Sequence, residues 1–93
     1  MGGILLSAAL IVRDEERFLE GCLRSLKDCV DEVVVVDTGS SDRSRDIAHH
    51  WGARVFSHPW RGDFAAARNA SVDAARGAWI LYIDADERVV EFD

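Results

Sequence analysis

The sequence contains two cysteines, and their spacing matches no common cysteine site. Cys22 and Cys29 stand apart in the chain, and no C-x-x-C pair is present. A structural zinc site or a disulfide framework is therefore not expected. Two reduced thiols are typical of a cytosolic protein. We therefore expect a cytoplasmic location, with attachment of a longer protein to the inner face of the membrane left open.

Long hydrophobic runs are also missing. The longest apolar stretch, residues 4–12, is interrupted by Ser7 and is far too short to cross a bilayer. The first residues lack the basic start and the small-residue cleavage site of a signal peptide. No transmembrane segment is expected in this chain. The residues after Arg88 complete no further element, so we expect the chain to be one part of a longer fold.

Positive charge is scarce, because 11 Lys and Arg residues face 17 Asp and Glu residues and the net charge is −6. Nucleic acid is not expected as a partner, since binding its phosphates requires a basic face. A nucleotide is still compatible, because one metal ion and one arginine can neutralise two phosphates. The phosphate-loop patterns G-x-G-x-x-G and G-x-x-x-x-G-K-[ST] are both absent.

Apolar stretches and helical patterns alternate along the 93 residues. Strands are predicted at 4–12, 33–36, 54–57 and 79–83, and helices at 15–27, 42–51 and 64–75. This order is typical of a single α/β domain with a parallel sheet and right-handed crossovers. We expect a Rossmann-like sheet of about four strands in the order 3-2-1-4, with helices on both faces.

Several residues mark the ends and faces of these elements. Ser40 or Ser41 is expected to cap the second helix, Gly52 to end it, and Asp63 to cap the third. Phe18 begins the apolar stripe of the first helix. The continuous apolar runs at 4–12 and 79–83 are typical of strands that are covered on both faces.

Acidic residues follow three of the predicted strands, the first of them ending at Val12-Arg13-Asp14. Asp37 ends the second strand, and Asp84, Asp86 and Glu87 follow the fourth. The carboxyl ends of parallel strands share the edge of the sheet that binds ligands. Mg²⁺ is typically held by one or two carboxylates together with substrate phosphates, so a metal–diphosphate site is expected here. The alternatives are a polar turn after the fourth strand and, for Asp37, a cap of the next helix.

Arg68 stands among alanines in the third predicted helix. An arginine among small residues suggests that something approaches that helix closely, and its guanidinium could meet a phosphate or stack on a base. The alternative is an ion pair with Asp63, with Asp73 or with an acid at a strand end.

Four stretches together resemble a known family. They read A-L-I-V-R-D-E-E-R-F-L-E-G-C-L-R-S-L, D-E-V-V-V-V-D-T-G-S-S-D-R-S, D-F-A-A-A-R-N-A and W-I-L-Y-I-D-A-D-E, in this order over nearly the whole chain. In them the sequence resembles the inverting nucleotide-sugar glycosyltransferases with the GT-A fold, glycosyltransferase family 2. The second and third stretches look most like the bacterial branch that includes lipopolysaccharide-core and some peptide glycosyltransferases, which implies a role in cell-envelope polysaccharide synthesis.

The resemblance implies a set of nucleotide-binding positions. Val12 and Arg13 lie where the end of the first strand lines the base and ribose pocket, and Asp37 matches the acid that binds the uracil or ribose. Asp42 matches a second acid of the turn that is usually structural. Arg68 matches an arginine near the nucleotide. Residues 1–93 then correspond to the N-terminal, nucleotide-sugar-binding part of a GT-A domain.

The resemblance also implies a metal and a reaction. Asp84 matches the acid toward the ribose, and Asp86 matches the acid toward the Mg²⁺ or Mn²⁺ that bridges the diphosphate. A hexose from a UDP-sugar would pass with inversion to a hydroxyl of a saccharide, lipid-linked or peptide acceptor. The catalytic base and the acceptor-binding part are expected beyond Asp93. We therefore expect the chain to bind the donor without transferring the sugar.

Two other functions stay open. A non-catalytic nucleotide-binding module would use the same residues without any transfer. A haloacid-dehalogenase-type phosphohydrolase also carries Asp-x-Asp after a buried strand, but usually on its first strand and with Thr or Val where Arg88 stands. Independently of function, a fourth strand at the sheet edge would invite pairing with another chain, so a dimer is expected.

Overall fold

The computed structural model describes residues 5–83. Its elements follow one another as β1 (Leu6–Val12), α1 (Glu16–Leu26), β2 (Glu32–Asp37), α2 (Ser44–His50), β3 (Arg54–Ser57), α3 (Phe64–Ala74) and β4 (Trp79–Tyr82). Each predicted strand and helix is present, with its bounds within two residues of the prediction. The alternation of periodicities in the sequence was therefore sufficient to place the elements.

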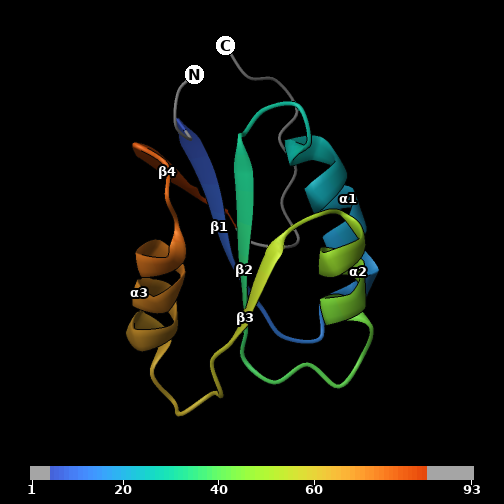
Figure 1. Cartoon of the computed structure of the whole chain (residues 1–93). Helices are drawn as coiled ribbons and strands as arrows, with labels where there is room; N and C mark the ends of the chain where they lie inside the picture. Colours follow the sequence, from blue (N-terminus) through green and yellow to red (C-terminus); the bar gives the residue numbers. More distant parts are fainter. Residues whose placement is uncertain (1–4, 84–93) are drawn as a thin grey trace.

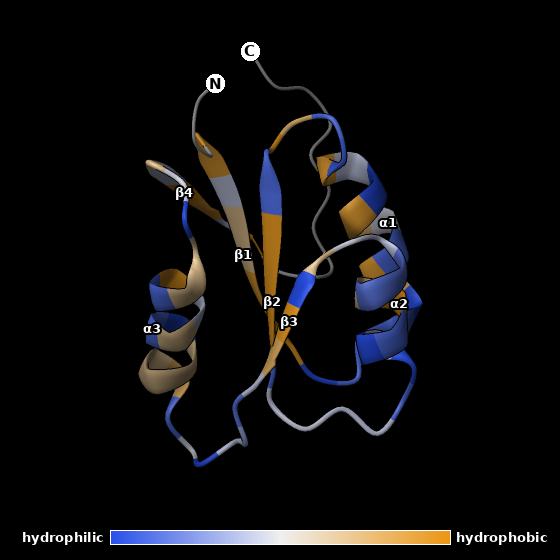
Figure 2. Cartoon of the chain, in the orientation of Figure 1, coloured by the Kyte–Doolittle hydropathy of each residue, from blue (hydrophilic) through white to orange (hydrophobic). Residues whose placement is uncertain are grey.

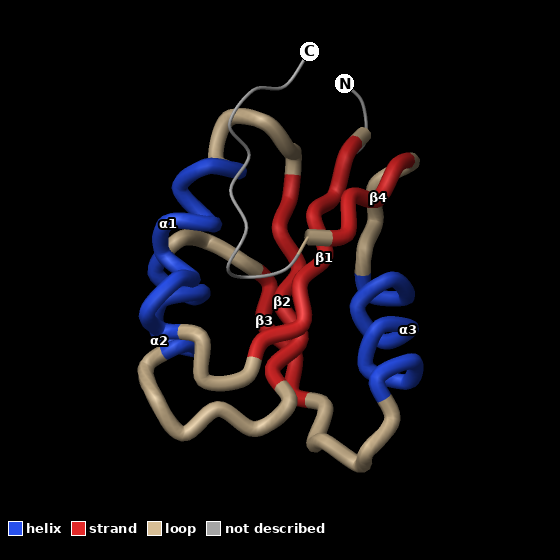
Figure 3. The backbone as a smooth tube through the Cα atoms, turned by 180° about the vertical axis from the view of Figure 1, so that it is seen from behind, coloured by secondary structure: helices blue, strands red, loops and turns tan. Residues whose placement is uncertain are grey.

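The strands form a parallel sheet in the order β3-β2-β1-β4. Helices α1 and α2 cover one face, and α3 covers the other (Figure 1). The same two-sided arrangement is seen from behind in Figure 3. The predicted fold class, a Rossmann-like sheet of order 3-2-1-4 with helices on both faces, is confirmed.

The two central strands hold most of the core, and Figure 2 shows hydrophobic residues along them and mainly hydrophilic residues on the outside of α1 and α2. Alternate residues of a strand point to opposite faces. On the α1 and α2 side the main buried cluster is Ala8, Leu10, Val12, Leu19, Cys22, Leu23, Leu26, Val35, Ala48, Ala53 and Ile83. On the α3 side the small residues Ala67 and Ser71 are fully buried, which lets α3 lie close to the sheet.

Two of the predicted helix ends are confirmed. The Asp63 side chain accepts a hydrogen bond from the Ala66 N–H at 3.1 Å and caps α3. Gly52 follows α2 with φ +80°, a conformation that glycine adopts without strain, and its N–H donates to the His49 carbonyl at 3.0 Å.

The predicted cap of α2 is wrong. Neither Ser40 nor Ser41 caps this helix, because both side chains are hydrogen-bonded to Asp14 in the preceding loop. Instead Asp42 accepts the N–H of Ser44, the first residue of α2, at 2.9 Å. Composition identified the turn correctly but did not show which polar residue of the turn would face the helix.

The apolar run of β4 differs from the expectation, whereas that of β1 does not. Residues of β1 are buried as predicted, but Trp79 is 69% and Ile80 39% exposed in β4. Strand β4 pairs with β1 on one side, and no other described strand pairs with it. A continuous apolar run therefore marks a strand without showing that both of its faces are covered. Phe18, expected in the stripe of α1, is likewise 40% exposed.

Candidate functional site

The carboxyl ends of three strands meet at one edge of the sheet, the lower end in Figure 1. The register places Val12 of β1 beside Asp37 of β2, and Asp37 beside Ser57 of β3. Backbone hydrogen bonds continue past the strand ends, from the Thr38 N–H to the Val12 carbonyl at 3.0 Å and from the His58 N–H to the Asp37 carbonyl at 2.8 Å. The backbone at this edge is therefore held firmly in place.

Within residues 5–83, one carboxylate oxygen of Asp37 is hydrogen-bonded and the other is not. Its Oδ2 accepts the N–H groups of Gly39 at 3.3 Å and Ser40 at 3.1 Å. Its Oδ1 is buried and has no hydrogen-bond partner among the described residues, and Asp37 as a whole is 3% exposed. A buried acceptor without a donor costs about 1–3 kcal/mol. This oxygen is therefore ready to accept a hydrogen bond from a ligand.

Arg45 adds positive charge beside this carboxylate. Its Nε lies 3.9 Å from Oδ2 of Asp37, and the arginine side chain is half exposed. At that distance and exposure the pair contributes little to stability. Arg13, on the loop after β1, is exposed at the same edge, whereas the neighbouring Val12 is buried. The edge thus combines a buried carboxylate with exposed guanidinium groups.

The loop after β1 is tied to the loop after β2 through Asp14. The carboxylate oxygen Oδ1 of Asp14 accepts the N–H groups of Ser41 at 2.7 Å and Asp42 at 3.3 Å. The Asp14 N–H donates to Oγ of Ser40 at 2.9 Å. Asp14 has φ +52°, a conformation that Asp adopts more readily than most residues. These contacts fix the position of the turn that carries the backbone donors to Asp37.

Asp42 and Ser44 complete the same connection. Oδ2 of Asp42 accepts the Glu16 N–H at 3.1 Å, and the buried Oγ of Ser44 accepts the Glu15 N–H at 2.8 Å. Burial raises the pKa of Asp42, but hydrogen bonds from Ser44 and from backbone N–H groups lower it by more, so the net pKa lies below its usual value. The structural role implied for Asp42 fits these contacts.

Arg68 projects from α3 toward the end of β4. Its guanidinium carbon lies 4.9 Å from the centre of the Tyr82 ring. Among the ion pairs of residues 5–83, none involves Arg68, so neither Asp63 nor Asp73 is its partner. The alternative of a structural ion pair with these two acids is wrong.

The predicted metal ligands Asp84 and Asp86 lie outside the described residues. Ile83, the last residue that is described, donates its N–H to the Ala9 carbonyl of β1 at 3.2 Å. Within residues 5–83, no group of three or more His, Cys, Asp or Glu side chains is arranged to hold a metal ion. The metal site stays a prediction of the sequence.

A groove of about 520 Å³ lies away from the strand ends, between α1 and α2. Its lining residues are Glu20, Arg43, Asp46, Ile47, His50 and Trp51. No buried side-chain atom of this lining lacks a hydrogen-bond partner, so the groove offers a ligand nothing comparable to Asp37. In the described part of the chain, no helix is long and apolar enough to cross a membrane.

Sequence reasoning placed Asp14 at the end of the first strand but missed its contacts, and it missed Ser44. Their partners, Ser41 and Glu15, are 27 and 29 residues away in the chain, so no local pattern reveals the contacts. The available signal was indirect. Both loops follow adjacent strands of a parallel sheet, and such loops lie side by side, so polar residues in them could have been paired.

Comparison with known proteins identifies one family. The family model described as Glycosyl transferase family 2 matches residues 7–91. A TPR repeat-containing protein of Synechococcus elongatus is 51% identical over 84 residues, which are 90% of this chain and 21% of that protein. The lipopolysaccharide core biosynthesis glycosyltransferase LpsC of Rhizobium meliloti is 36% identical over 89 residues, covering 90% of this chain and 32% of LpsC.

Solved structures give the same match. Glucosyl-3-phosphoglycerate synthase of Mycobacterium tuberculosis, in complex with Mn²⁺, UDP and glucosyl-3-phosphoglycerate, superposes with a TM-score of 0.76 and 31% identity. The match covers 92% of this chain and 36% of that enzyme. The same enzyme has also been solved with Mg²⁺ and UDP. The chain therefore spans about a fifth to a third of the length of these relatives.

Proposed function

The chain belongs to glycosyltransferase family 2, and we propose that it forms the donor-binding part of a transferase that uses a nucleotide sugar. One observation carries the proposal, the buried Oδ1 of Asp37 without a hydrogen-bond partner among residues 5–83. A ribose hydroxyl or a base N–H of a nucleotide would supply the missing donor. The oxygen lies at the carboxyl edge of a parallel sheet, where such sheets bind ligands.

Val12 and Arg13 provide further nucleotide contacts at the same edge, and Arg68 provides one from α3. Val12 and Arg13 line the pocket for the base and ribose, next to Asp37. Arg68 binds the diphosphate with its guanidinium, which is planar and matches phosphate oxygens in pairs. The register that sets Val12 beside Asp37 supports this grouping. The nucleotide is a uridine diphosphate, by analogy with the UDP-bound synthase.

Asp84 and Asp86 are the residues that would hold a divalent cation. Carboxylate oxygens are the hard ligands that suit Mg²⁺ or Mn²⁺, and both ions accompany UDP in the related synthase. The residue before Asp84 in the sequence, Ile83, is hydrogen-bonded to β1 through its N–H. When bound, the cation supplies positive charge to the leaving diphosphate.

In the whole protein, the reaction is transfer of a hexose with inversion to a hydroxyl of a saccharide, lipid-linked or peptide acceptor. The catalytic base lies beyond Asp93, so residues 1–93 are the donor-binding part and are inactive alone. The similarity to LpsC supports a role in cell-envelope polysaccharide synthesis, at a cytoplasmic location.

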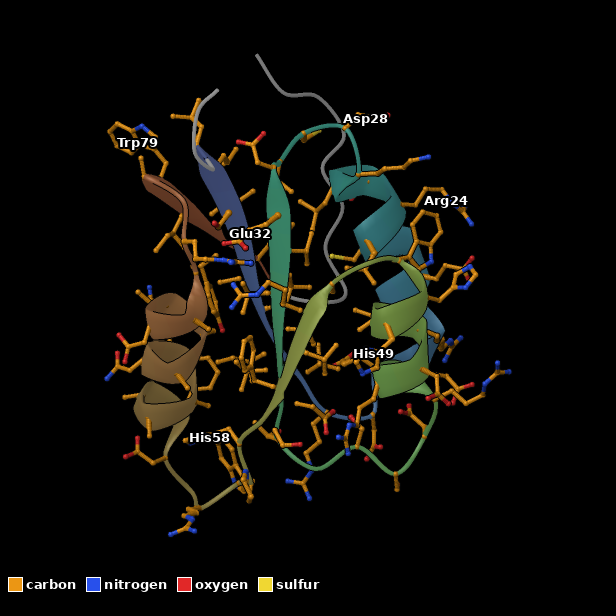
Figure 4. The ribbon with its side chains drawn as sticks, in the orientation of Figure 1. Arg24, Asp28, Glu32, His49, His58 and Trp79 are labelled. Carbon is orange, nitrogen blue, oxygen red and sulfur yellow. The ribbon has the colours of Figure 1, made fainter. Side chains whose placement is uncertain are left out.

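Calorimetry with UDP, with and without Mn²⁺, tests the proposal. The unmodified chain is expected to bind UDP only with the metal, and Asp86→Ala to lose that binding. Asp37→Asn is expected to bind UDP about 10- to 100-fold more weakly, because a neutral amide oxygen replaces a charged acceptor. Asp28→Asn is the matched control, since Asp28 is exposed and lies far from the proposed site. Figure 4 shows it at the opposite end of the sheet from His58, whose N–H donates to the Asp37 carbonyl.

Three outcomes would count against the proposal. UDP affinity that is equal in Asp37→Asn and in the control would remove its main support. Tight phosphate binding without metal would favour a different phosphate-binding function. Measurable sugar transfer by the 93-residue chain would contradict the division between a donor-binding part and a base beyond it.

The exposed edge of β4 also leads us to propose that this chain associates with a second copy of itself. Trp79 and Ile80 present apolar side chains there. The N–H and carbonyl groups on the free side of an edge strand are available to a further strand.

A further inference from the structure

We propose that Tyr82 is a positioning residue for the donor diphosphate, acting through Arg68. The inference rests on the proposed function above. The guanidinium of Arg68 lies over the Tyr82 ring, 4.9 Å from its centre. A cation over an aromatic face within about 6 Å is attracted to the ring. The ring thereby favours one placement of a long and otherwise flexible side chain.

Among residues 5–83, no side chain or backbone group uses the hydrogen-bonding capacity of the Arg68 guanidinium. A guanidinium carries five N–H donors in its plane, whereas stacking engages only its face. Among residues 5–83 this guanidinium makes no ion pair and no hydrogen bond. An arginine that is oriented but has all its donors free is suited to bind an anion with several oxygens, such as a diphosphate.

The close packing of α3 on the sheet explains why the guanidinium of Arg68 can reach the Tyr82 ring. Ala67 and Ser71 are fully buried against the sheet, so α3 lies close to it. Arg68 follows Ala67 and is exposed, so it lies on the flank of α3 and reaches the ring of β4. A larger residue at either buried position would move the helix away and separate the guanidinium from the ring.

The position of Tyr82 indicates where the anion would bind. Tyr82 is the last residue of β4 and lies opposite Ala9 of β1. The next residue, Ile83, is hydrogen-bonded to the same strand, because its N–H donates to the Ala9 carbonyl. Asp84, the first of the proposed cation ligands, follows directly in the sequence. The ring thus attaches the Arg68 cation to the strand that leads into the proposed metal motif.

Two kinds of variant distinguish the contribution of the Tyr82 ring from that of its hydroxyl. Tyr82→Phe keeps the ring, and Tyr82→Leu removes it, with Tyr82→Met as the substitute if the Leu variant does not fold. UDP with Mn²⁺ is titrated by calorimetry. Uridine, which has no phosphate, is titrated by NMR with Mg²⁺.

Tyr82→Leu is expected to weaken UDP binding about two- to fivefold and to leave uridine unchanged. Tyr82→Phe is expected to bind both ligands as the unmodified chain does. Arg68→Gln is expected to lower the affinity for UDP about tenfold or more. In the Arg68→Gln background, Tyr82→Leu should have no further effect, because the ring then has no cation to hold.

The stack itself is measured without any ligand. The Nε–H resonance of Arg68 should carry a ring-current shift that persists in Tyr82→Phe and disappears in Tyr82→Leu. Three results would each overturn the positioning role. One is an Arg68 resonance that is unchanged in Tyr82→Leu. The others are a loss of affinity that is equal for UDP and uridine, and a loss of UDP affinity that is equal in Tyr82→Phe and Tyr82→Leu. If Arg68→Gln weakens UDP and Tyr82→Leu does not, the inference fails while the proposed function stands. If the unmodified chain binds no UDP, both fail.

Discussion

Glu32 is a carboxylate with several partners, and it stands at the opposite edge of the sheet from Asp37. Its Oε2 accepts the Ser7 hydroxyl and the Arg76 N–H, each at 2.6 Å. Its Oε1 lies 3.2 Å from Nη1 of Arg54, which also donates to the Ala74 carbonyl. One buried side chain (Figure 4) therefore connects β1, β2, β3 and the end of α3.

Glu32→Gln is expected to lower the free energy of unfolding by about 1–3 kcal/mol, because it replaces a charged acceptor in a buried network. The matched control is Glu20→Gln, which breaks the exposed pair with Arg24 at 3.2 Å and should cost less than about 0.5 kcal/mol. Urea unfolding at neutral pH measures both. Equal effects of the two substitutions would show that the Glu32 network adds nothing to stability.

Acid should destabilise the fold through the same residue. Burial raises the pKa of Glu32, but hydrogen bonds from Ser7, Arg76 and Arg54 lower it by more, so the net pKa lies below the ordinary 4.5. The unfolded state then binds more protons than the folded state, and stability falls as pH drops below about 4.5. The unfolding free energy of the parent should fall more steeply between pH 5 and about 3 than that of Glu32→Gln. Parallel slopes would contradict this.

At the scale of elements, the strands and helices were predictable because their signals are local. Continuous apolar runs and helical spacing marked each element, and their alternation predicted a parallel sheet. Contacts between loops were not predictable, since Asp14 and Ser41 are distant in the sequence and meet only because β1 and β2 are neighbours. The exposure of Trp79 was missed for a related reason, because burial depends on what packs against a strand.

The connection between the two loops can be tested at Asp14. Asp14→Ala removes the acceptor for the Ser41 and Asp42 N–H groups at a residue with φ +52°. It should lower the free energy of unfolding by about 1–3 kcal/mol and weaken UDP binding, because the turn that positions Asp37 loosens. Asp14→Asn keeps an acceptor oxygen and tolerates the same φ, so it should retain most of both quantities. Urea unfolding and calorimetry measure the stability and the UDP affinity of the two variants. If Asp14→Asn loses as much of both as Asp14→Ala, the explanation is contradicted.

At the scale of the whole molecule, the proposed pairing through the edge of β4 predicts a dimer in solution. Light scattering across a range of concentrations is expected to give a dimer mass at the high end. Ile80→Lys places a charge on the edge strand and should shift the protein to the monomer, as charged residues on natural edges do. A monomer mass at high concentration for the unmodified chain would contradict association through this edge.

The family match, the sheet order and the unpaired oxygen are three different kinds of observation that support the proposed nucleotide site. The family match extends over residues 7–91, the strands pair in the order β3-β2-β1-β4, and Oδ1 of Asp37 lacks a hydrogen-bond partner among residues 5–83. The same sheet that buries the valines of β2 sets Asp37 at the edge where the nucleotide is proposed to bind. The proposed binding site therefore depends on the geometry of the folded sheet.

The most direct test maps the binding site on the whole molecule. Backbone amide resonances of the ¹⁵N-labelled chain are followed while UDP is added with Mg²⁺. The largest shifts are expected at Gly39 and Ser40, whose N–H groups already bond to Asp37, together with Arg13 and Arg68. Shifts centred on the groove beside Trp51, or none at saturating UDP, would contradict a nucleotide site at the carboxyl edge of the sheet.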